Sequence, residues 1–143
     1  MGSGICQAIG MCLGDKRPTI CVCGDGGIQM HGMEVLTAIK HKLPIIFAIF
    51  NDGRYNMVHH GFRFMYGREE KIGYTDMIDF VKMFEAMGVP GALITSPNQI
   101  NQELISSFLN NGPAILDIRI NKDIKIKGAG RNEALKQMGE YDA

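Results

Sequence analysis

The sequence predicts an α/β fold, a three-layer α/β/α domain with a parallel sheet. Two short apolar segments, Ile20–Cys23 and Ile45–Phe50, each lead into a polar loop that contains glycine. A segment of helical length connects them, which is the pattern of a βαβ unit. The two loops should therefore meet at the carboxyl edge of the sheet, where ligands bind in open α/β sheets.

The first half of the chain predicts two helices around the first strand. From Gly4 to Leu13, apolar residues recur with the spacing of one helix face. The strand over Thr19–Cys23 is apolar without a break, which predicts burial on both of its faces. A second helix is expected from about Ile28 to Lys42, before the strand over Ile45–Phe50.

The second half predicts a long irregular segment followed by three regular elements. Residues 53–73 exceed the length of an ordinary loop, so they are expected to contain a short helix and to border the site. Thr75 or Asp76 can cap a helix that runs through Met87 and closes at Gly88. The remaining expected elements are a strand over 92–95, a helix over 96–109 that starts at Ser96-Pro97, and a strand over 114–120.

Length and composition indicate one globular domain over residues 1–120, with residues 121–143 as a polar tail or arm. Fifteen basic and fifteen acidic residues cancel, so nucleic-acid binding has no electrostatic support. The longest apolar run, Leu43–Phe50, is too short to span a bilayer, which predicts no membrane association. No charged N-terminal segment followed by a long apolar run suggests a signal peptide, and a cytoplasmic location is expected. The four cysteines are expected to be buried free thiols, since Cys21-Val22-Cys23 is not a CxxC motif.

Asp25 and Asp52 stand in the two loops at the expected sheet edge. Two carboxylates beside glycines that free backbone N–H groups suit a hard cation such as Mg²⁺ bridging to phosphate oxygens. Each aspartate could instead cap a helix or a turn, where Asp is common. For either loop alone, both interpretations stay open.

Three linked motifs resemble those of thiamin-diphosphate-dependent enzymes. Gly24-Asp25-Gly26-Gly27 followed by Asn51-Asp52 is similar to the family's cofactor fingerprint. Met1-Gly2-Ser3-Gly4 with Gln7-Ala8-Ile9-Gly10 resembles the stretch that precedes it in the acetolactate synthase and pyruvate decarboxylase group. Asn56-Met57-Val58 lies where acetolactate synthases carry Gly-Met-Val. The resemblance covers residues 1 to about 120 and is greatest to the diphosphate-binding (PP) domain of the acetolactate synthase large subunit.

The resemblance implies a set of residues that bind thiamin diphosphate and Mg²⁺. The metal would be held by the side chains of Asp25 and Asp52 and by the backbone carbonyl of Arg54. Asp52 departs from the family, in which Asn is commoner; the change keeps an oxygen ligand. The residues expected to contact the cofactor are Met1, Gly2, Ser3, Gly24, Asp25, Gly26, Gly27, Asn51, Asp52, Asn56 and Met57. Among them Met1 would wedge beneath the bent cofactor, although it could simply be where the chain starts.

Two histidines are candidates for acid–base catalysis. His59 and His60 follow the Asn-Met-Val element, close to where the substrate is expected. Surface or structurally satisfied histidines are the commoner case. Arg54, Arg63 and Arg68 could attract a 2-oxo acid carboxylate, but solvated surface charge is the expectation for each.

The implied reaction is decarboxylation of a 2-oxo acid, such as pyruvate, and ligation of the resulting carbanion to a carbonyl acceptor, as in a transferase or lyase. In the family a glutamate on a pyrimidine-binding domain activates the cofactor, so that domain or subunit is expected as a partner in a homo- or hetero-oligomer. Alternatives are a 2-oxo acid decarboxylase, a benzaldehyde-lyase-like carboligase or a non-catalytic assembly subunit. An unrelated nucleotide-binding domain lacks support, because GDGG is neither GxGxxG nor a Lys-containing phosphate loop.

Overall fold

The computed structural model describes residues 1–68, 73 and 76–124. The chain divides into two compact units. The first contains Met1–Asp52 and Met77–Ile120, and the second contains Gly53–Asp76 and Asn121–Ala143.

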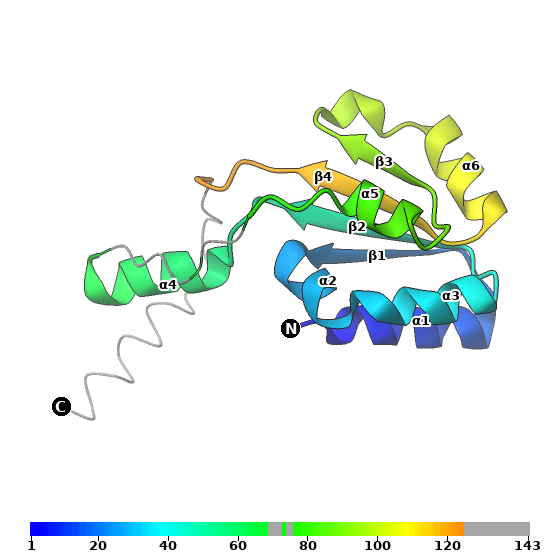
Figure 1. Cartoon of the computed structure of the whole chain (residues 1–143), viewed down its shortest axis with the longest axis horizontal. Helices are drawn as coiled ribbons and strands as arrows, with labels where there is room; N and C mark the ends of the chain where they lie inside the picture. The colour runs from blue at the N-terminus through cyan, green and yellow to red at the C-terminus, as the bar shows by residue number, and fades with distance from the viewer. Residues whose placement is uncertain (69–72, 74–75, 125–143) are drawn as a thin grey trace. The chain divides into compact units, whose positions relative to one another are not determined.

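A four-stranded parallel sheet forms the centre of the first unit (Figure 1). Its strands are β1 (Thr19–Gly24), β2 (Ile45–Asn51), β3 (Gly91–Ile94) and β4 (Ala114–Arg119), in the order β1-β2-β4-β3. Gly24 pairs with Phe50, and Asn51 pairs with Arg119. The carboxyl ends of β1, β2 and β4 are therefore aligned at one edge, and the predicted α/β fold is confirmed.

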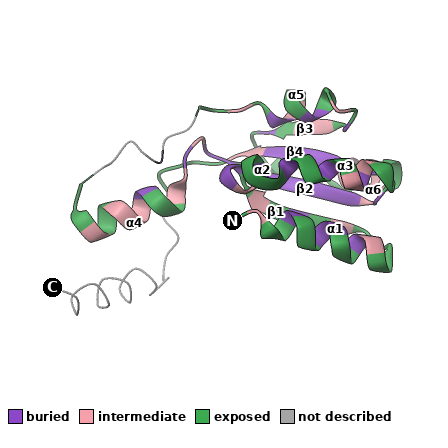
Figure 2. Cartoon of the chain, turned by 60° about the horizontal axis from the view of Figure 1, so that its bottom comes forward, coloured by how far each residue is buried: buried purple, intermediate pink, exposed green. Residues whose placement is uncertain are grey.

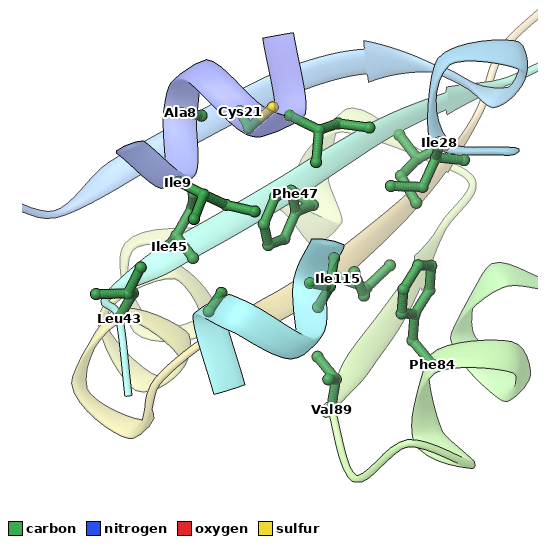
Figure 3. Close-up of a cluster of buried hydrophobic side chains, with 14 of the residues drawn as sticks. Ala8, Ile9, Cys21, Ile28, Leu43, Ile45, Phe47, Phe84, Val89 and Ile115 are labelled. Atoms are coloured by element: carbon green, nitrogen blue, oxygen red, sulfur yellow. The ribbon is translucent and has the colours of Figure 1, made fainter. Parts of the chain in front are cut away.

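Four helices and the main hydrophobic cluster cover one face of this sheet. The helices are α1 (Ser3–Asp15), α2 (Asp25–His31), α3 (Val35–Lys40) and α5 (Phe80–Glu85). Figure 3 shows side chains of this cluster, in which Phe47 of β2 lies among residues from the helices. Phe47, Phe84 and Ile115 are all 0% exposed. Burial of these apolar side chains holds the helices on the sheet.

The other face carries α6 (Gln102–Asn111) over the β2, β4 and β3 side of the sheet. Its apolar residues pack on a smaller cluster that includes Ile46, Ile94 and Leu116. Ile20 and Val22 of β1 are 54% and 60% exposed, so the prediction that this strand is buried on both faces is wrong. The reason is that β1 lies at the end of the strand order, whereas β2 and β4 are mostly buried (Figure 2).

The expected helix over residues 28–42 is two short helices. It begins at Asp25 rather than near Ile28, and a 3₁₀ turn, η1 (Gly32–Glu34), separates α2 from α3. A Cβ added at Gly32 would lie 3.2 Å from the Phe84 ring, so this turn packs tightly against α5.

Two later helices also start at other residues than expected. Asp79, not Asp76, caps α5, since its side chain accepts a hydrogen bond from the Lys82 N–H. Thr75, the other expected cap, lies outside the described residues. The helix expected over 96–109 is a 3₁₀ turn, η3 (Pro97–Gln99), followed by α6 with Asn101 as its cap.

The second unit contains α4 (Asn56–Tyr66), which confirms the short helix predicted within residues 53–73. Tyr55 N–H donates to the Gly73 carbonyl at 2.7 Å just before the helix. Of the residues expected to form a tail, only 121–124 are described, so that prediction lies almost wholly outside the described chain. No described helix is both long enough and apolar enough to cross a bilayer.

Candidate functional site

The carboxyl edge of the sheet carries the two aspartates that the sequence singles out. Asp25 follows β1 directly and is 5% exposed, and Asp52 follows β2 and is 6% exposed. Because β1 and β2 are neighbours in parallel register, both carboxylates belong to one stretch of the edge. Their burial distinguishes them from ordinary surface aspartates, which are mostly exposed.

The loop after β1 becomes helix α2 at once. Gly24 is extended and stands at the N-cap without a side-chain cap, and Asp25 begins the helix. The Gly26 N–H donates to Asp25 Oδ1 at 2.7 Å, which fixes the orientation of that carboxylate. A Cβ added at Gly24 would meet nothing within 4 Å, so the backbone is open to a ligand there.

The N-terminal segment lies against this glycine loop. A Cβ added at Gly27 would come 3.7 Å from the Gly2 nitrogen, which brings together two predicted site residues 25 positions apart. Gly2 has a φ of +83°, and a Cβ there would lie 2.2 Å from Nδ1 of His31. A side chain at position 2 would therefore be strained and would require the His31 ring to move. Met1, next to it, is 65% exposed, and Ser3 is exposed as the first residue of α1.

The thiols of β1 are electrostatically linked to this edge. The pKa of Cys23 is raised, first by its hydrogen bond with Cys21, then by burial and by the nearby charges of Cys21 and Asp25. The pKa of Cys21 is lowered by the same hydrogen bond. All four cysteines are free, as expected, but the burial expected for Cys6 is wrong, because it lies on the exposed side of α1.

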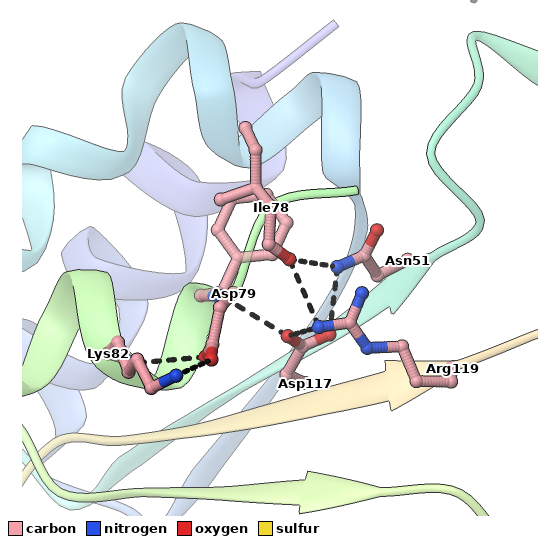
Figure 4. A network of polar contacts seen from close by, with 7 residues as sticks. Asn51, Ile78, Asp79, Lys82, Asp117 and Arg119 are labelled. Carbon is pink, nitrogen blue, oxygen red and sulfur yellow. Dashed lines mark hydrogen bonds and ion pairs between the residues drawn. The ribbon is translucent and has the colours of Figure 1, made fainter. Parts of the chain in front are cut away.

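Asn51, the last residue of β2, points its side chain into a buried polar network (Figure 4). Its Nδ2 donates to the Ile78 carbonyl at 2.9 Å and to Asp117 Oδ1 at 3.0 Å. Asp117 is 0% exposed and also pairs with Arg119 at 2.8 Å. Sequence reasoning missed Asp117 and Arg119; the available signal was one acidic residue inside the apolar strand Ala-Ile-Leu-Asp-Ile-Arg.

The second unit holds the other predicted residues around the start of α4. The Arg54 side chain is buried, 4% exposed as a whole residue, so the expectation of a solvated arginine is wrong there. Its guanidinium donates to the Lys122 carbonyl and lies 3.5 Å from an Asp123 carboxylate oxygen, while its Nε donates to Asn56 Oδ1 at 3.1 Å. Arg63 and Arg68 are exposed. Met57, in the first turn of α4, is 66% exposed.

The two candidate catalytic histidines are neighbours in α4. Their ring centroids are 5.3 Å apart in an edge-to-face arrangement. His59 is 3% exposed, whereas His60 is partly exposed. Acid–base catalysis requires contact of a ring nitrogen with a substrate. Both ring nitrogens of His60 are buried, as is Nδ1 of His59, so exposure does not separate the two candidates.

The residues at the sheet edge fit Mg²⁺ with a diphosphate better than an all-protein metal site. Within the described ranges, no three or more His, Cys, Asp or Glu side chains are grouped to hold a metal ion. Mg²⁺ commonly uses one or two carboxylates and takes its other ligands from phosphate oxygens and water. Asp25 and Asp52 provide such a pair, beside open glycine backbone.

The comparisons with known proteins agree on one family. The model for "Thiamine pyrophosphate enzyme, C-terminal TPP binding domain" matches residues 1–118. A probable acetolactate synthase large subunit of Methanocaldococcus jannaschii is 33% identical over 85% of this chain and 21% of its own length. The acetolactate synthase of Bacillus subtilis is 32% identical over 98% of this chain and 24% of its own length. The chain thus spans about a quarter or less of these relatives.

A solved structure supports the fold. The thiamine diphosphate-dependent 4-hydroxybenzoylformate decarboxylase of Rhodococcus jostii RHA1 matches with a TM-score of 0.73. The match covers 85% of this chain and 23% of that enzyme, at 24% identity. At this identity the likeness concerns the fold alone.

Proposed function

Because this chain belongs to the family of C-terminal TPP-binding domains of thiamine pyrophosphate enzymes, we propose that it binds thiamin diphosphate through Mg²⁺ as the diphosphate-binding part of an acetolactate-synthase-like enzyme. The observation that carries the proposal is the pair of buried carboxylates, Asp25 and Asp52, after neighbouring parallel strands. Thiamin diphosphate, when bound, supplies the electron sink for decarboxylation of a 2-oxo acid.

In this proposal the protein's first task is to hold the metal. Asp25 and Asp52 offer one carboxylate each, and the backbone carbonyl of Arg54 completes the protein ligands. Asp25 is already oriented by the Gly26 N–H, which reduces the freedom lost on binding. The carboxylate of Asp52 adds a negative charge relative to the commoner Asn, and this strengthens attraction to the cation.

The glycine loop and the N-terminal segment would hold the rest of the cofactor. Gly24 and Gly27 present backbone without a side chain, which lets N–H groups approach phosphate oxygens closely. Gly26, whose N–H donates to Asp25 Oδ1, would contribute by orienting that carboxylate. Backbone at Asn56 and Met57 adds further contacts to the diphosphate. Gly2 lies against Gly27, so Met1, Gly2 and Ser3 stand next to the loop, consistent with a role around the aminopyrimidine.

The proposed reaction joins two carbonyl compounds after loss of CO₂ from a 2-oxo acid such as pyruvate. His60 or His59 would transfer protons to or from the substrate. A pyrimidine-binding domain or subunit, carrying the glutamate that activates the cofactor, is the required partner. Acetolactate-synthase relatives are about four times longer than this chain, which leaves room for such a domain in the complete assembly.

Calorimetric titration of the chain with thiamin diphosphate, with and without Mg²⁺, tests the proposal. We expect Mg²⁺-dependent binding that Asp25→Ala and Asp52→Ala each weaken by about 100-fold, because each removes a metal ligand. Asp15→Ala is the matched control, since Asp15 is an exposed aspartate at the end of α1, paired with Arg17. It should bind like wild type.

The same titration is repeated with a pyrimidine-binding domain present, because the diphosphate-binding domain alone would supply only part of the cofactor site and is expected to bind weakly. Absence of Mg²⁺-dependent binding in both titrations would overturn the assignment. With binding established, product analysis after addition of pyruvate separates the reactions: acetolactate supports carboligation, and acetaldehyde a simple decarboxylase. A complex that consumes no 2-oxo acid would indicate a non-catalytic assembly subunit.

A further inference from the structure

A carboxylate within the sheet is not a ligand in the proposed metal site, yet it accepts a hydrogen bond from the residue next to a proposed metal ligand. Asp117 lies in the middle of β4 and is 0% exposed. Three groups donate to it: Asn51 Nδ2 at 3.0 Å, the Phe80 N–H at 3.2 Å and the Arg119 guanidinium at 2.8 Å. Its charge is thus paired and hydrogen-bonded, as a buried charge requires.

A buried ion pair is weak evidence for stability. Removing two charges from water is costly, and well-packed apolar residues of similar volume often stabilise a fold as well or better. The neighbours of Asp117 in β4, Ile115 and Leu116, are both buried and apolar, so apolar side chains in place of the whole network could pack here. The presence of a carboxylate at position 117 therefore indicates another role, such as fixing an orientation of its hydrogen-bond partners that apolar contacts would not specify.

The network fixes one particular conformation at the end of β2. Asn51 Nδ2 donates to two acceptors, Asp117 Oδ1 and the Ile78 carbonyl. A 180° flip of the amide would place its oxygen next to these two acceptor oxygens, so the observed orientation is the favoured one. The Asn51 carbonyl also accepts from the Ile120 N–H at 3.2 Å. Side chain and backbone of Asn51 are therefore held to β4 and to the segment before α5.

Asp52 follows this immobilised residue directly. The direction in which its carboxylate leaves β2 is set by the backbone of Asn51, because consecutive Cα atoms are only about 3.8 Å apart. Mg²⁺ requires near-ideal octahedral geometry at about 2.0–2.1 Å, and small displacements of a ligand are costly. We infer that Asp117 is a positioning residue, which acts through Asn51 to hold Asp52 in the geometry that selects Mg²⁺.

This inference rests on the proposed function, and it adds a residue that the family resemblance did not suggest. Asn51 had been expected to contact the cofactor. Both of its amide hydrogens are directed into the network, which acts on the site through the placement of Asp52 and leaves the cofactor contact of Asn51 a prediction. Arg119, at the partly exposed side of the network, has the same role, since its guanidinium also donates to the Ile78 carbonyl at 3.1 Å.

The test compares two cations rather than measuring affinity alone. Thiamin diphosphate is titrated into the chain, together with a pyrimidine-binding domain, in the presence of Mg²⁺ or of Ca²⁺. Ca²⁺ accepts flexible geometry at about 2.3–2.6 Å, so a displaced Asp52 should weaken Mg²⁺ more than Ca²⁺. We expect Asp117→Asn to lower the Mg²⁺-over-Ca²⁺ preference by about 10-fold, in the range seen for groups that orient metal ligands.

A matched control separates positioning from loss of stability. Ile115→Val removes a methyl group from a fully buried residue two positions earlier in β4, and it should destabilise the fold while leaving the cation preference within about 2-fold of wild type. Arg119→Gln removes the ion pair from a side chain that is 22% exposed, and should shift the preference in the same direction by about 3-fold. If Asp117→Asn does not fold, the cation preference of Arg119→Gln decides the test.

The outcomes are distinct. Wild-type binding with an unchanged cation preference in the folded variants would refute the positioning role and leave the proposed function standing. Failure of wild type to bind the cofactor with either cation would refute the proposed function, and the inference with it.

Discussion

The two units hold their predicted site residues by different means. In the first, Asp25 and Asp52 follow paired strands, so backbone hydrogen bonds of the sheet set their separation. In the second, the contacts that hold the start of α4 include the side-chain hydrogen bonds of the buried Arg54. Disturbing a side chain should therefore change the second unit locally, whereas the first unit should respond as a whole.

The largest effect on turnover is expected from the histidines of α4. In the assembled enzyme, His60→Asn should lower kcat by about 100-fold or more, the typical contribution of a general acid or base, with cofactor binding changed less than about 3-fold. Steady-state kinetics beside calorimetry separates the two quantities. His59→Asn is the paired variant: His59 is buried, so we expect it to affect thermal stability more than kcat.

Two histidine variants that both turn over at the wild-type rate would contradict acid–base catalysis from α4. The proposed chemistry would then be confined to the first unit and its partner domain. A loss of kcat in His59→Asn alone would exchange the roles of the two residues.

The contrast between the units also explains which features the sequence could predict. The strands and the GDGG and Asn-Asp loops follow from short apolar runs that end in polar, glycine-containing segments, and both runs became β1 and β2 within one residue at either end. The α4 helix could be predicted only as a short helix somewhere in a long loop. Its boundaries depend on contacts such as that of Tyr55 with Gly73, which no local pattern encodes.

Other features depend on strand order, which periodicity does not reveal. Val22 belongs to an apolar strand like those at the centre of a sheet, but β1 stands at the end of the order and Val22 is 60% exposed. Asp117 was equally hidden, since its partners Asn51 and Phe80 lie 66 and 37 positions away. The buried state of Arg54 likewise depends on residues 122 and 123.

A smaller, local effect is expected from Arg54→Ala. Removal of the guanidinium leaves Asn56 Oδ1 without this donor and the Lys122 carbonyl with only the bond from Asn56 Nδ2, at a cost of about 1–3 kcal/mol. Amides of α4 should therefore exchange hydrogen roughly 30-fold faster, a factor equivalent to about 2 kcal/mol of local opening. Amides of β2 should keep their protection.

Hydrogen exchange of Arg63→Ala provides the control for Arg54→Ala. Arg63 is an exposed arginine of the same helix, and its truncation should leave exchange nearly unchanged. Acceleration of β2 amides in Arg54→Ala equal to that of α4 would show that the two units open together, and would contradict a local response of the second unit.

The smallest effect is expected at Asp79, a cap within the first unit. The backbone N–H of Lys82, and then its side chain, lower the pKa of Asp79 below its ordinary value of 3.8. A carboxyl group whose pKa is lower in the folded state stabilises the fold at pH values above 3.8, and that contribution is lost as the pH falls through the folded-state pKa. Asp79→Asn should therefore lower the melting temperature slightly at pH 7 and by less near pH 3. Asp76→Asn, which removes the same charge before the helix without removing its cap, should not reproduce this dependence on pH; if it does, the effect comes from net charge and α5 does not depend on its cap.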